Sequence, residues 1–160
     1  MEPFDRERLV AGRLRSLRVV CMALAATVLA YGIVGWFLIE GFQMHPFGRV
    51  PDALPLSLTF FSAVLILLAS RLRTAILRSG LPSMRGLPVD RVSLMGAYHR
   101  ATLVSFAVLE AAALMGLVVA LLSGSSFYGM VLCVASFLSM LLRWPKAHEL
   151  DRLARGRVSP

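Results

Sequence analysis

The stretch that decides the fold is ATLVSFAVLEAAALMGLVVALL at residues 101–122, in which Glu110 is the one charged side chain. A helix needs about 20 predominantly apolar residues to cross the hydrocarbon core of a bilayer. The run lacks the alternation of apolar and polar residues that a strand of a membrane β-barrel requires. We therefore predict that residues 101–122 form a membrane-spanning helix.

Three further apolar stretches, separated by charged or Pro/Gly-rich segments, repeat this pattern. They lie at about 18–40, 55–72 and 126–143. Only the short sequence SGSS joins the last two spans, at residues 123–126, so these spans form an antiparallel hairpin. The sequence thus predicts an all-α fold: an integral membrane four-helix bundle made of two antiparallel hairpins, with helical extensions into the cytoplasm.

The overall composition excludes two other classes of protein. The residues AVILMFWYC make up 58 % of the 160 residues, 16 % are charged, and the mean hydropathy is +0.73. A soluble domain of this size would expose much of that apolar surface and aggregate. A disordered chain is excluded as well, because there is far too much apolar surface to leave in water.

The positions of the basic residues predict the orientation. The net charge is +8, and all but one of the 17 Lys and Arg residues precede the first span, lie between the second and third spans, or follow the fourth. The exception is Arg49. The positive-inside rule therefore places both termini in the cytoplasm of a bacterial-type inner membrane. We expect the bilayer and its anionic headgroups as partners, and no nucleic acid, because no basic recognition motif or aromatic platform accompanies the charge.

The chain is predicted to be one four-span membrane domain over residues 1–160. Residues 1–17 are predicted to form an interfacial amphipathic segment that leads into the first span. Residues 71–100 are expected to be a basic cytoplasmic helix-turn-helix connection, which extends the second and third spans beyond the membrane. Residues 144–160 form a basic tail.

Glu110 is the residue that most needs an explanation, because it lies near the middle of its span. A charged carboxylate there is costly, about 2.5–3.5 kcal/mol for an Asp on insertion scales. A carboxyl group avoids that cost by staying protonated, by pairing, or by meeting water. No Lys or Arg lies at that depth, but four side chains on other spans lie at compatible depths to hydrogen-bond it: Tyr31, Ser62, Cys133 and Ser136. Proton or ion handling and interhelical hydrogen bonding both remain open.

A separate stripe of small residues runs along the same span. Ala112, Gly116 and Ala120 are spaced four apart, and such a ladder allows close approach of a neighbouring helix in lipid. The stripe lies about 120° around the helix from Glu110. We therefore predict that these three residues are the helix-packing surface and that Glu110 lies on a different, oily face.

The run LEAAALMGLVVA at residues 109–120 resembles the carboxylate helix of the proteolipid c subunits of F- and V-type rotary ATP synthases. In that family an essential Glu or Asp is followed by Ala and, six positions after the acid, by Gly within an apolar run; here these residues are Glu110, Ala111 and Gly116. The family also joins this helix to the preceding one through a cytoplasmic polar loop. The resemblance implies that Glu110 is a reversible carrier of protons or Na⁺.

Two functions follow from these observations. The first is a c-subunit-like inner-membrane protein that handles protons or ions through Glu110. The alternative is a non-catalytic accessory or scaffold subunit of a larger membrane complex, with Glu110 neutral and structural. Both imply other membrane subunits or further copies of the chain as partners. No phosphate-binding loop, HExxH, CxxC or nucleophile elbow occurs, so we expect no enzyme activity, no catalytic residue, no cofactor and no metal site.

Overall fold

The computed structural model describes residues 3–42, 51, 53–80 and 91–154, and these residues form helices and no strands. A short π-helical turn, η1, continues the first helix. In chain order the elements are α1 (Pro3–Trp36), η1 (Phe37–Gly41), α2 (Ala53–Gly80), α3 (Arg91–Ser123), α4 (Ser126–Leu142) and α5 (Ala147–Ala154). The all-helical prediction is confirmed for this part of the chain.

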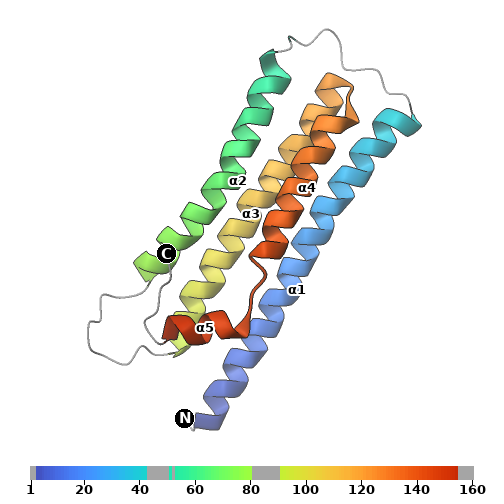
Figure 1. Cartoon of the computed structure of the whole chain (residues 1–160). Coiled ribbons are helices and arrows are strands. Elements are labelled where there is room, and N and C mark those ends of the chain that lie inside the picture. The colour runs from blue at the N-terminus through green and yellow to red at the C-terminus, as the bar shows by residue number, and fades with distance from the viewer. Residues whose placement is uncertain (1–2, 43–50, 52, 81–90, 155–160) are drawn as a thin grey trace.

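The four long helices lie side by side, and α5 crosses one end of the bundle (Figure 1). Helix α3 contacts α1, α2, α4 and α5, which makes it the central helix. Its inward face contributes Phe106, Leu109 and Ala113 to the core, where they pack with Val28 of α1 and Cys133 of α4. Both cysteines, Cys21 and Cys133, are free and buried.

The helices have lengths and compositions that suit a membrane. Among the described residues, three segments are long and apolar enough to cross one: Arg8–Gly41, Ala53–Ser79 and Leu94–Ser123. Helix α4 is a shorter apolar helix of 17 residues, about 25 Å long, at the lower limit for a span. Large apolar side chains also remain exposed on the outside of the bundle, with Phe60 at 72 % and Leu142 at 83 %. These features suggest a membrane protein.

The amino-terminal segment predicted to be interfacial is the beginning of helix α1. Residues 3–17 are the first turns of α1 and continue into the span without a break. Leu14 and Leu17 are buried in the core cluster, and Val10 packs against that cluster. These three residues therefore face the bundle, whereas Leu9 is 49 % exposed, and the location of this segment at a membrane surface stays a prediction.

Helices enter the connection over 71–100 from both sides. Helix α2 continues to Gly80 and α3 begins at Arg91, well before the apolar run. The predicted turn between them lies outside the described residues. In the tail, α5 starts three residues after Trp144 and packs on α3.

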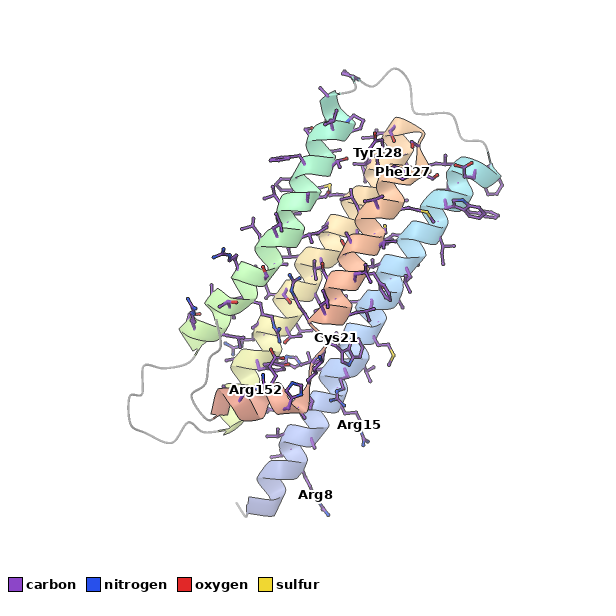
Figure 2. The ribbon with its side chains drawn as sticks, viewed as in Figure 1. Arg8, Arg15, Cys21, Phe127, Tyr128 and Arg152 are labelled. Atoms are coloured by element: carbon purple, nitrogen blue, oxygen red, sulfur yellow. The ribbon has the colours of Figure 1, made fainter. Side chains whose placement is uncertain are left out.

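The two ends of the bundle have different chemistry. Figure 2 shows Arg8, Arg15 and Arg152 at the end where α1 begins, and Phe127 and Tyr128 at the opposite end. The rings of Phe127 and Tyr128 lie 5.7 Å apart in an edge-to-face arrangement. Basic residues at one end and aromatic residues at the other form the pattern expected where helices meet the two membrane surfaces.

Candidate functional site

The candidate site is built around Glu110 in the seam between α1 and α3. The hydroxyl of Tyr31 in α1 donates a hydrogen bond to Oε1 of Glu110 in α3, with 3.4 Å between the two oxygens. This distance is long for an O–H···O bond, so the interaction is a weak one. The bond nevertheless joins two helices through their only described polar contact at this depth, which identifies Tyr31 as the partner of the carboxyl.

Glu110 is half-buried, and it lies at the edge of that seam. Phe106 and Ala113, on one side of it around α3, are buried, whereas Ala107, Ala111 and Leu114 on the other side are exposed. The face around Glu110 is thus oily as predicted, but part of it packs on α1. The carboxyl therefore lies between a packed interface and the outward face of α3.

The other three predicted partners do not bond Glu110. The Ser62 hydroxyl donates to the Leu58 carbonyl of its own helix, and the Cys133 thiol donates to the Ala113 carbonyl at 3.6 Å. Ser136 Oγ is buried without a hydrogen-bond partner among the described residues. The depth of each residue in its span had identified candidates on the other three spans. Among the described residues, only α1 presents a polar side chain to the face of α3 that carries Glu110.

The small-residue stripe of α3 packs against α4. A Cβ added to Gly116 would lie 2.9 Å from Cβ of Leu132 and 3.2 Å from the Gly129 carbonyl oxygen. Ala112 and Ala120 are buried on the same side of the helix. Both faces of α3 are therefore occupied: the stripe contacts α4, and the face of Glu110 contacts α1.

Gly129 of α4 lies opposite this stripe and was not among the residues predicted from the sequence. A Cβ on Gly129 would lie 2.6 Å from Cβ of Ala120 and 2.8 Å from the Gly116 carbonyl oxygen. Both distances are shorter than real Cβ contacts, so only glycine fits there. Gly129 and Ala120 lie on opposite sides of the short turn at 124–125, in the two arms of the hairpin. This placement is the sequence feature that could have indicated their contact.

A second polar cluster joins three helices at the basic end of the bundle. Arg73 Nη2 of α2 donates to both carboxylate oxygens of Glu149 in α5, each at 3.0 Å. The hydroxyl of Tyr98 in α3 donates to Glu149 Oε2 at 2.8 Å, and the Arg73 guanidinium lies 5.5 Å from the centre of the Tyr98 ring. The carboxylate of Glu149 therefore ties α5 to the ends of α2 and α3.

This cluster contains more positive than negative charge. Burial, and then the charge of Arg73, lower the pKa of the Arg143 guanidinium, which follows the end of α4. Arg73 Nε and Arg143 Nη1 are buried and have no hydrogen-bond partner within the described part of the chain. Glu149 is thus the acid paired with Arg73, whose positive charge also acts on Arg143.

The sequence contained one sign of this cluster. Arg73 follows Ser62, Ile66 and Ala69 at helical spacing, on the stripe of α2 that faces the bundle. A basic residue on a buried stripe needs an acidic partner. The sequence did not indicate which acid is the partner. Helical periodicity relates Arg73 only to other residues of α2, and not to Glu149 in the distant tail.

Comparison of the chain with family models, with curated proteins and with solved structures found no match. The resemblance to the proteolipid c subunits consequently rests on residues 109–120 alone.

Proposed function

We propose that the chain is a non-catalytic accessory or scaffold subunit of a bacterial-type inner-membrane complex, in which Glu110 is neutral and structural. The observation that carries the proposal is the hydrogen bond from Tyr31 to Glu110 across the α1–α3 seam. A neutral carboxyl that accepts a bond in hydrocarbon avoids the cost of a buried charge and adds to helix association. The small stripe supports the same role, because α4 of the same chain covers it.

The proposal includes four membrane crossings with both termini and the 71–100 connection in the cytoplasm. The start of α1, the end of α2, the start of α3 and α5 all lie at one end of the bundle (Figure 1). That end carries Arg8, Arg15 and Arg152 (Figure 2). The positive-inside rule favours the cytoplasmic side for such an end.

Cysteine labelling tests this orientation. A membrane-impermeant maleimide added to intact cells is expected to modify Ser125→Cys, in the turn before α4, and to leave Ser79→Cys at the end of α2 unmodified. The native cysteines are buried and give a low background. Permeabilised cells provide the control, since both variants should then react. Modification of Ser79→Cys in intact cells would reverse the orientation.

A second candidate is proton or ion handling through Glu110, as the resemblance to proteolipid c subunits implies. The observation that favours it is the position of Glu110 at the edge of the seam, beside the exposed residues Ala107, Ala111 and Leu114. A carboxyl in that place is accessible from the outward face of α3. A carrier needs such access to bind and release its ion.

Substitution of Glu110 separates the two functions. In the structural role, Glu110→Gln should unfold in detergent at the same denaturant concentration as the parent, because its amide oxygen still accepts from Tyr31. Glu110→Ala should lower the free energy of unfolding by about 1 kcal/mol, because the hydrogen bond between α1 and α3 is lost. Tyr31→Phe should lose a similar amount, and the two losses should not add, because both variants remove the same bond. Tyr128→Phe, on the exposed outer end, is the matched control and should change nothing.

If Glu110 instead carries protons, the expected results concern transport rather than stability. In proteoliposomes with a pH-sensitive dye, the parent would then dissipate a proton gradient, and Glu110→Gln would abolish that flux while remaining folded. Dicyclohexylcarbodiimide would modify Glu110 of the parent, since the reagent attacks protonated carboxyls in lipid. Proton flux that depends on Glu110 would contradict the scaffold role, whereas modification by the reagent is also expected of a neutral carboxyl at this position.

A further inference from the structure

An open groove lies between α1 and α3 at the basic end of the bundle. It encloses about 240 Å³. Its lining comes from both helices: Arg13, Ser16, Met95, Gly96, His99 and Arg100. The groove is separate from the Glu110 seam and from the cluster around Glu149.

The lining combines positive charge with an open floor. Two guanidinium groups and an imidazole line the groove together with Met95 and Gly96, and Ser16 adds a hydroxyl. A Cβ built on Gly96 meets no atom within 4 Å, so a ligand group has room above this residue. The salt bridge among the described residues joins Arg73 and Glu149, and no described carboxylate pairs with Arg13 or Arg100.

The groove lies at the depth of the lipid headgroups in the proposed orientation. The apolar run of α1 begins after Arg18, and at about 1.5 Å per residue Ser16 and Arg13 lie about 3 and 7.5 Å from Arg18 along the helix, on the side away from that run. Arg100 directly precedes the apolar run of α3. The headgroup layer on each side of a bilayer is about 5–7.5 Å thick. The cationic side chains of the groove therefore fall within that layer.

We propose that this groove binds the phosphate group of an anionic lipid from the cytoplasmic leaflet. Guanidinium groups match phosphate oxygens in charge and in geometry, and two of them on different helices hold a phosphate from two sides. One turn further into the membrane on the same faces, Val20 and Val104 are exposed and provide apolar surface for acyl chains. That surface favours a lipid over a soluble phosphate compound. The inference rests on the orientation proposed above, and it does not depend on the role of Glu110.

Lipid binding to the purified full chain tests the proposal. Native mass spectrometry in dodecyl maltoside should show bound phosphatidylglycerol in preference to phosphatidylcholine with the same acyl chains. The double variant Arg13→Gln, Arg100→Gln should weaken phosphatidylglycerol binding about tenfold or more, as expected for the loss of charge-assisted hydrogen bonds. The matched control is Arg15→Gln, Arg71→Gln, which removes the same charge from exposed positions outside the groove and should change binding less than twofold.

Gly96→Leu tests the groove without a change of charge. Its side chain would occupy the open floor and should reduce phosphatidylglycerol binding to the level of the double arginine variant. Leucine has a higher helix propensity than glycine, so loss of binding with an unchanged thermal unfolding curve is a steric effect.

Three results would overturn the inference. Equal loss of binding in the groove and control variants would mean that charge acts over the whole surface. Equal binding of phosphatidylcholine would remove the role of the anionic headgroup. Binding of glycerol 3-phosphate with the same dependence on Arg13 and Arg100, and no preference for phosphatidylglycerol, would replace the lipid by a soluble phosphate compound. A reversed orientation would instead appear in the cysteine labelling alone, because lipid binding in detergent does not depend on sidedness.

Discussion

Gly129→Leu is expected to prevent α4 from packing on α3 and to destabilise the bundle by at least about 3 kcal/mol, because overpacking usually costs about 1–3 kcal/mol and here the obstacle is main chain. Even the first added carbon would lie 2.6 Å from Cβ of Ala120 and 2.8 Å from the Gly116 carbonyl oxygen. Neither atom is the end of a flexible side chain, so the helices themselves must separate. Unfolding by sodium dodecyl sulfate in mixed micelles, followed by circular dichroism, measures the loss.

The chain contains a matched control for this substitution. Gly129→Ala should already lower the stability, since its Cβ meets the same two atoms. Gly96→Ala, also in a helix, adds a Cβ that meets nothing within 4 Å, and it should be neutral or stabilising by up to about 1 kcal/mol. Equal tolerance of alanine at both positions would contradict the close approach of α3 and α4.

Glu149→Ala is expected to release α5 from the bundle and to cost about 2 kcal/mol, since it removes charge-assisted hydrogen bonds to a mostly buried arginine. The Arg73 side chain is 13 % exposed and that of Glu149 is 34 % exposed. Without the carboxylate, Arg73 would lose its acidic partner while the positive charge of Arg143 still acts on it. Hydrogen exchange of the α5 amides, together with the micelle unfolding measurement, reports both effects.

Two further variants identify the cause of that loss. Glu40→Ala removes another carboxylate with a hydrogen-bond donor, Ser126, but at an exposed position, and its effect should stay within about 0.5 kcal/mol. Arg73→Met combined with Glu149→Ala should recover part of the stability, because the unpaired charge is then gone. If Glu149→Ala leaves the exchange of α5 unchanged, the proposed tie between α5 and the bundle is absent.

The apolar runs and the charges between them were sufficient to predict the helices. Residues 101–122 lie inside α3, and 126–143 matches α4 to within one residue, because a long uncharged run has few alternatives to a helix. The short sequence at 123–126 dictated the hairpin of α3 and α4. The spacing of Ala112, Gly116 and Ala120 indicated the stripe that packs on α4.

The partners of these residues are a property of the tertiary structure. Helical periodicity relates residues of one helix to each other, but it does not say how neighbouring helices are rotated. Tyr31 was therefore one of four candidates for Glu110 until the rotation of α1 against α3 selected it. The sequence by itself thus determined the helices, the stripe of small residues on α3 and the presence of a carboxyl group in a membrane span. Only the packing of the bundle decided that Gly129 faces Ala120, that Glu149 pairs with Arg73 and that Leu14 and Leu17 belong to the core. These contacts join segments whose distance in space is not determined by the sequence between them.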